Sequence, residues 1–437
     1  MKHTILLCTA LLSTIFTGTA QQSGRICHTE AIPYHTRHDA ETRNRAASGH
    51  TMDFRPALLV EAGPVSVMGQ QVDIPYIWRD GVVFLHLENP GSAYSLRVND
   101  RLVADVEDAA TPADFELTDC LHEGVNDIKI LLRESRTPQI DIPTIAPRET
   151  FAESYFYYQN KRSIADFQIA LVPDTLGRDF AMLDLKIIAR NAFNYDETVE
   201  VGYDIYSPQG KLLEFNMREV TIPGRSTDTV RFTPFIYHAF ENKWEPSGKN
   251  PPLYKVMLFT RRQGAYKEYM PLRLGFGKTE LVDGRLMRSG KELKLRTKSY
   301  NAAINARATS AELQALRKEG YNTLTPDYPQ PGWFYDLCDS LGLYVIDRAN
   351  IHAPERRNDR RVGGTPSNDP ALLDEYLERV KAMYYRSRNH TCVIAYALGG
   401  EAGNGYNMYK AYLWLKSVEH ARPVLCVDAD GEWNSDL

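Results

Sequence analysis

The chain has 437 residues, with 51 lysines and arginines against 56 aspartates and glutamates, so its formal net charge at pH 7 is −5. Basic and acidic residues are interspersed along the sequence, so no segment carries the excess of positive charge that nucleic-acid binding requires. Nucleic acid is therefore not expected as a partner, and the length predicts more than one domain.

Residues 1–20 are expected to form an export signal. Lys2 precedes an apolar stretch at residues 5–16, and Gly18 and Ala20 supply small side chains at positions −3 and −1 of a cleavage site. The apolar stretch is shorter than the roughly 20 residues that span a bilayer, which argues against a membrane anchor. No other stretch is long enough, so we predict no transmembrane segment and a secreted or periplasmic protein that is cleaved near Ala20.

Cysteine usage gives no sign of a disulfide framework. Cys8 lies in the predicted signal. The five cysteines that remain are Cys27, Cys120, Cys338, Cys392 and Cys426. That number is odd and the spacing matches no metal-ligand pattern, so we expect no metal ion and no cofactor.

Residues 73–147 are expected to fold as a β-sandwich. Apolar and polar residues alternate with period two at 82–87 and 127–132, and turn residues separate the runs. This alternation is typical of antiparallel strands. Residues 21–72 include a polar stretch with no clear period, and the sequence gives no prediction of helices or strands for this segment.

A second β-sandwich is expected at residues 148–275, after a linker marked by Pro138, Pro143 and Pro147. Its strands are predicted at 164–172, 182–189, 198–206 and 219–222. Roughly seven strands in about 120 residues are typical of an immunoglobulin-like sandwich.

Residues 276–437 change to a repeated pattern of strand, loop and helix. Strands are predicted near residues 293, 322, 343, 392 and 423. The helix predicted at 369–385 has Asp369 and Pro370 at its start and apolar residues at helical spacing. Such units indicate a parallel sheet with helices outside. A closed eight-stranded barrel takes about 250 residues, so we expect a partial barrel of about five strands, with bare edges that an oligomer would cover.

Several stretches carry a resemblance to one known family. In the sandwiches they are NDRLV at 99–103, TPADF at 111–115, WEP at 244–246, NPPLY at 250–254 and GFG at 275–277. In the barrel segment they are YPQP at 328–331, FYDLCD at 334–339, GLYVID at 342–347, ANI at 349–351, RNH at 388–390 and RPV at 422–424. Together with the module order, these stretches resemble glycoside hydrolase family 2, the β-galactosidase and β-glucuronidase family. The resemblance implies a multidomain β plus α/β fold: a jelly-roll-like sandwich, an immunoglobulin-like sandwich and a partial (β/α)8 TIM barrel.

The resemblance also implies a function, the hydrolysis of terminal β-glycosidic bonds, with a β-linked glycan or oligosaccharide as the partner. The retaining reaction uses two carboxyl groups about 5–5.5 Å apart, one as nucleophile and one as acid/base. Glu401, in the loop after the fourth predicted strand, matches the acid/base residue. The family's nucleophile lies at the end of the seventh strand, and this sequence ends where the sixth would begin. Asp428, Asp430 and Glu432 are expected to be loop residues.

Seven positions are implied as substrate-binding residues: Asn301, Asp327, Tyr328, Asn350, His352, Gly400 and Trp433. Where this chain has Gly400, the family has an asparagine that binds the sugar 2-hydroxyl. Where it has His352 and Pro354, some members have a glutamate and a histidine that help to hold magnesium, so a hard-cation site is not expected. A solvated loop histidine remains the alternative for His352, as does a partly exposed loop tryptophan for Trp433.

Three interpretations stay open. The first is an exported hydrolase of terminal β-linked sugars with Glu401 as acid/base, although the absent nucleophile argues against turnover by this chain alone. The second is a non-catalytic carbohydrate-binding protein derived from the family, which replaced pocket residues such as Ala302, Thr325 and Gly400 favour. The third is a fragment of a longer hydrolase.

Overall fold

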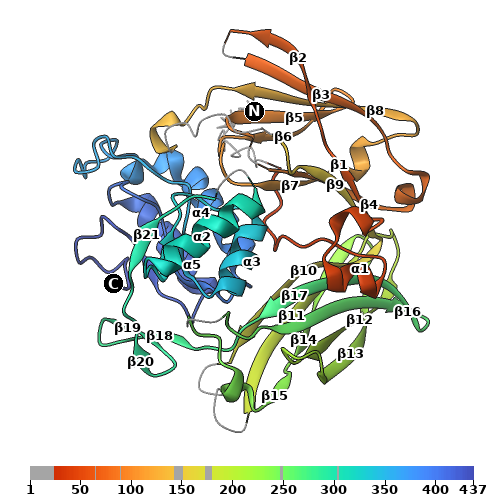
Figure 1. Ribbon diagram of the computed structural model, residues 1–437. Coiled ribbons are helices and arrows are strands. Elements are labelled where there is room, and N and C mark those ends of the chain that lie inside the picture. Colours follow the sequence, from red (N-terminus) through yellow and green to blue (C-terminus); the bar gives the residue numbers. More distant parts are fainter. Residues whose placement is uncertain are drawn as a thin grey trace, which may run out of the picture.

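The computed structural model describes residues 24–63, 65–88, 90–141, 151–172, 180–246, 250–302 and 305–437 (Figure 1). The predicted signal at residues 1–20 lies outside this part of the chain. No helix within the described ranges is long and apolar enough to cross a membrane. Two β-sandwiches lie one above the other in Figure 1, and an α/β unit lies beside them.

The first sandwich consists of two antiparallel sheets around one apolar core. One sheet has the order β1-β9-β4-β7, with β1 (Thr51–Asp53), β4 (Gly81–Leu87), β7 (Ala113–Glu116) and β9 (Tyr155–Asn160). The other has the order β2-β3-β8-β5-β6, with β2 (Ala57–Ala62), β3 (Val65–Asp73), β5 (Ala93–Val98), β6 (Arg101–Val106) and β8 (Val125–Arg133). Side chains along β8 alternate between buried and more exposed positions, as the period of two predicts.

This sandwich is larger than the predicted 73–147. Strands β1 to β3 come from the segment for which we predicted no element, and β9 follows the predicted end. β3 pairs with β8 over its whole length, from Ser66 opposite Leu132 to Asp73 opposite Val125. Few of its side chains are fully buried, so the local sequence shows little apolar alternation and pairing with β8 is what defines the strand.

The second sandwich runs from Arg162 to Leu274, within the predicted 148–275. One sheet contains β10 (Arg162–Leu171), β11 (Phe180–Asn191), β14 (Ser226–Phe232) and β15 (Phe235–Tyr237). The other has the order β13-β12-β16-β17, with β12 (Glu197–Tyr206), β13 (Leu212–Ile222), β16 (Tyr254–Arg262) and β17 (Ala265–Leu274). The strands predicted at 164–172, 182–189 and 198–206 correspond to β10, β11 and β12.

The α/β unit contains five parallel strands in chain order. They are β21 (Thr297–Ser299), β22 (Thr323–Thr325), β23 (Tyr344–Arg348), β24 (Val393–Ala397) and β25 (Val424–Leu425). The helices are α2 (Ala306–Lys318), α3 (Gly332–Leu341), α4 (Leu373–Ser387) and α5 (Tyr406–Val418). The first strand begins later than the predicted position near 293, because a small antiparallel sheet of β18 (Thr279–Val282), β19 (Arg285–Arg288) and β20 (Lys291–Glu292) precedes it.

One sheet edge that we expected to be bare is covered by the chain itself. The Asp436 N–H donates to the Val424 carbonyl at 2.8 Å, and the Val424 N–H donates to Asp436 Oδ2 at 2.8 Å. The Cys426 N–H donates to Ser435 Oγ at 3.1 Å. These bonds satisfy backbone groups of β25 that an unprotected edge strand leaves free.

Residues 24–50, called the strap below, join all three modules and include α1 (Arg37–Thr42). The Ile26 N–H donates to Asp114 of the first sandwich, and Tyr34 exchanges two backbone hydrogen bonds with Tyr269 of the second, all at 2.9 Å. Arg43 pairs with Asp336 of α3 at 2.7 Å. The strap therefore fixes the modules relative to one another through long-range contacts to each of them.

A buried polar network connects the strap, the first sandwich and the α/β unit. Arg379 of α4 is fully buried, and its Nη1 lies 2.7 Å from both Asp141 Oδ1 and the Asn350 carbonyl. Asn350 Nδ2 donates to Asp108 Oδ1 at 2.6 Å, and Arg25 Nη1 donates to Asp108 Oδ2 at 3.1 Å. Buried charges are tolerated only when they are paired in this way.

Replacement of Arg379 by methionine should lower the free energy of unfolding by about 3–5 kcal/mol, because Asp141 would lose its ion-pair partner and Asp108 would keep only Arg25 of its two neighbouring buried arginines. Equilibrium urea unfolding measures the change. Arg231→Met is the matched control: this exposed arginine pairs with Asp184 at 2.9 Å on the surface of the second sandwich, and its loss should cost at most about 1 kcal/mol. Equal losses in the two variants would contradict the role given to the network.

Candidate active site

The carboxyl ends of the five parallel strands meet at one edge of the sheet, which is where barrels of this type carry their active sites. Glu401 follows β24, in the predicted position. Its Oε1 lies 3.0 Å from Arg357 Nη1, and its side chain is 57% exposed. A proton donor in glycoside hydrolysis needs surroundings that raise its pKa, such as an apolar pocket. The Glu401 carboxylate is thus largely exposed and has a guanidinium partner.

Backbone hydrogen bonds hold the Glu401 loop against the loop after β23. The Gly400 N–H donates to the Ile351 carbonyl at 2.8 Å, and the Ala353 N–H donates to the Glu401 carbonyl at 2.8 Å. A Cβ atom at Gly400 would lie 3.3 Å from His352 Nδ1 and 3.6 Å from Arg348 Nη1. The imidazole and the guanidinium therefore border the space into which a longer side chain at this position would extend.

Asn301 and Asp327 are close together at the same edge, but they hydrogen-bond each other. Asn301 Nδ2 donates to Asp327 Oδ2, and the Asp327 N–H donates to Asn301 Oδ1, both at 2.9 Å. Arg348 Nη1 adds an ion pair with Asp327 Oδ1 at 3.3 Å. A sugar hydroxyl would have to compete with these contacts, so the cluster is held by its own partners.

Two predicted substrate-binding residues are buried instead. Asn350 is 1% exposed, and its side-chain amide donates to Asp108 of the first sandwich. Tyr328 is 5% exposed, and its carbonyl accepts from Gln330 Nε2 at 2.6 Å. Asn350 thus connects modules and Tyr328 packs in the interior, and the substrate-binding role of both stays a prediction.

Trp433 lies in the loop after β25 and is 56% exposed. Its ring stacks on Tyr409 of α5 with the centroids 5.3 Å apart, and it meets Tyr412 edge-on at 5.7 Å. Asn404 Nδ2 donates to Glu432 Oε2 at 3.3 Å, which places this loop beside the one that carries Glu401. An indole fixed in this way presents a flat apolar surface of the kind on which a sugar ring stacks.

The acidic residues after β25 are occupied by contacts within the loops, as expected for loop residues. Asp428 Oδ2 accepts the N–H groups of Ala402 and Gly403 at 2.8 and 2.6 Å, directly after Glu401. Asp430 and Glu432 both pair with Arg360. Asp428 therefore positions the Glu401 loop, a role that its place after a parallel strand could have indicated.

The surface next to Glu401 is cationic. A hollow of about 550 Å³ lies there, with Arg356, Arg357 and Arg361 in its lining. Sequence reasoning overlooked Arg348 and Arg357, although Arg348 stands at the carboxyl end of a parallel strand, where site residues concentrate. Each of the two pairs with a carboxylate of the predicted sugar site, Arg348 with Asp327 and Arg357 with Glu401.

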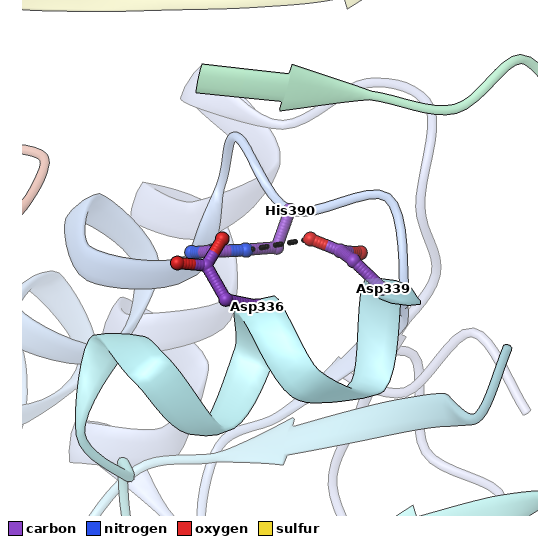
Figure 2. A group of neighbouring side chains, drawn as sticks. All are labelled: Asp336, Asp339 and His390. Atoms are coloured by element: carbon purple, nitrogen blue, oxygen red, sulfur yellow. Dashed lines mark hydrogen bonds and ion pairs between the residues drawn. The ribbon is translucent and has the colours of Figure 1, made fainter. Parts of the chain in front are cut away.

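Within the described residues, one group of three side chains brings possible metal ligands within 4.8 Å of one another: Asp336, Asp339 and His390 (Figure 2). His390 Nδ1 pairs with Asp339 Oδ2 at 2.8 Å, and Asp339 Oδ1 accepts the Cys392 N–H at 2.7 Å. Asp336 pairs with Arg43 of the strap. His390 precedes β24 whereas Glu401 follows it, so this group lies at the opposite edge and connects modules.

Residues 298–436 match the family model described as glycosyl hydrolases family 2, TIM barrel domain. The chain is 27% identical over 387 residues to a β-galactosidase of Lactococcus lactis, with 86% of this chain and 36% of that protein covered. It is 28% identical over 351 residues to a β-galactosidase of Vibrio cholerae, with 76% and 33% covered. The chain is thus similar to glycoside hydrolase family 2 over most of its length, and its α/β unit matches the barrel domain of that family. The chain spans about a third of the length of these curated relatives.

Solved structures share the fold of this chain. A β-glucuronidase of Bacteroides uniformis has a TM-score of 0.69 at 17% identity, with 83% of this chain and 46% of that chain covered. A structure described as a putative β-galactosidase from Bacteroides fragilis has a TM-score of 0.68 at 16% identity, with 83% and 55% covered. The resemblance drawn from the sequence motifs is thus confirmed at the level of the family.

Proposed function

We propose that this chain binds a terminal β-linked sugar at the carboxyl edge of β21 to β25, and that hydrolysis depends on a second carboxylate that the described residues do not place beside Glu401. The observation that carries the proposal is the position of Glu401 after β24 of a family 2 barrel segment, with the exposed Trp433 in the neighbouring loop.

Double displacement needs a free nucleophilic carboxylate close to the acid/base residue. Among the described residues at this edge, Asp327, Asp428, Asp430 and Glu432 each already have a cationic or backbone partner. This arrangement supports sugar recognition better than turnover. The β-galactosidase and β-glucuronidase relatives suggest a neutral galactoside or a uronide as ligand, and the arginines beside Glu401 favour the charged sugar.

The chain should therefore not hydrolyse aryl β-galactosides or aryl β-glucuronides faster than its Glu401→Gln variant. Release of the aryl group, followed by absorbance, measures this. Turnover by the wild-type chain that Glu401→Gln abolishes would show that a nucleophile is present and would overturn the second half of the proposal.

Sugar binding is tested separately by titration calorimetry with methyl β-glucuronide and methyl β-galactoside. Trp433→Ala should weaken binding by about tenfold, the equivalent of about 1.4 kcal/mol, because the stacking surface is lost. Tyr237→Ala is the matched control, since Tyr237 is a comparably exposed aromatic residue, at 72%, on the second sandwich. Equal binding by both variants would remove Trp433 from the site.

We also propose that the protein is exported, on the basis of the apolar stretch at residues 5–16 and the small residues Gly18 and Ala20. Amino-terminal sequencing of the protein recovered from its native cells should give Gln21 as the first residue. An amino terminus at Met1 would contradict export by this signal.

A further inference from the structure

A cavity of about 280 Å³ lies where the strap, both sandwiches and α3 meet. None of its lining residues belongs to the edge that carries Glu401. Arg43 and Arg45 enter from the strap, Arg273 from β17 and Asp336 from α3. The cavity is therefore a feature of the docked modules and is separate from the proposed sugar site.

Each of the four acidic side chains that line the cavity has a cationic partner within 3.6 Å. The pairs are Glu30 with Arg386, Glu88 with His86, Glu153 with Arg45, and Asp336 with Arg43. His390, which also lines the cavity, pairs with Asp339 (Figure 2). The lining acids are thus neutralised by cations that are already in place.

Arg273 is not used in any of these ion pairs. Its Nη1 donates to Ser340 Oγ at 2.9 Å, and it has no carboxylate partner among the described residues. Burial and the neighbouring Arg43 guanidinium lower the pKa of Arg273, and the carboxylates of Asp336 and Asp339 only partly offset them. A partly buried guanidinium without an ion pair is a site at which an anion gains charge-assisted hydrogen bonds.

The remaining walls are largely apolar. Pro271, two residues before Arg273, lies on the same face of β17, and Trp333 lies on the first turn of α3. Trp333, Asp336 and Ser340 have the spacing i, i+3 and i+7, which places them on one face of that helix. An apolar surface therefore lies next to the unpaired guanidinium, in a volume suited to a small molecule.

We propose that this cavity binds a small organic monocarboxylate, whose carboxylate pairs with Arg273 and whose apolar body packs against Trp333 and Pro271. One uncompensated cation calls for one negative charge, which a carboxylate carries at neutral pH, whereas inorganic phosphate carries more. Both can take the planar fork of an arginine, but the apolar walls favour a ligand with an organic body.

Benzoate is the probe, and titration calorimetry of the full chain at neutral pH and fixed ionic strength is the measurement. The wild-type chain should bind benzoate saturably, and Arg273→Met should weaken the affinity at least tenfold. Arg231→Met, which removes a surface arginine distant from the cavity, should bind as the wild type does. Circular dichroism of each variant shows whether it is folded.

Two further probes of the wild-type chain keep the test decisive even if Arg273→Met does not fold. Benzyl alcohol has a similar shape but no charge and should not bind, and inorganic phosphate should not displace benzoate. The proposal is overturned if benzoate does not bind up to its solubility limit, if benzyl alcohol binds equally well, if phosphate competes, or if a folded Arg273→Met keeps the wild-type affinity.

Discussion

The buried network around Arg379 and Asp108 is the constraint on which the rest of the structure depends. Charges removed from water are stable only when their partners are held in place, so the network requires one arrangement of the strap, the first sandwich and the α/β unit. The network is also connected to the candidate site, through the loop that follows β23. Arg379 holds the Asn350 carbonyl, and the adjacent loop residues Ile351 and Ala353 hydrogen-bond the backbone of Gly400 and Glu401. Module docking and the position of the Glu401 loop are therefore parts of one arrangement.

The family assignment and the site geometry lead to different conclusions about the reaction. The retaining reaction of glycoside hydrolases needs two carboxylates, and Glu401 stands after the fourth parallel strand of a segment that matches a family 2 barrel domain. Its neighbours, however, pair it with Arg357 and leave it exposed, while the other carboxylates at this edge are occupied. The proposal of sugar recognition therefore rests on Glu401 and on the exposed indole of Trp433 in the neighbouring loop.

Sequence reasoning succeeded where local pattern reflects local burial. The alternation in β8, the strands β10 to β12 and the place of Glu401 after β24 all follow from periodicity or motif order. It failed where the partner lies far away in the chain. The strap has no period because its hydrogen bonds, ion pairs and apolar contacts go to three different modules, and β3 is defined by its pairing with β8. Asn350 resembled a sugar ligand in its motif, yet its amide is used by Asp108, and nothing in the neighbouring sequence indicates that contact.

Native-state hydrogen exchange in the wild-type chain and in Asp108→Asn tests most directly whether module docking fixes the site loops. The substitution keeps the shape of the side chain but removes the charge that faces Arg25 and Arg379 in the buried network. If the account is right, backbone amides at 349–354 and 398–403 exchange faster in Asp108→Asn, although residue 108 belongs to another module, while those of β16 and β17 are unchanged. Unchanged exchange in both site loops, in a variant whose network is broken, would show that the loops are ordered independently of module docking.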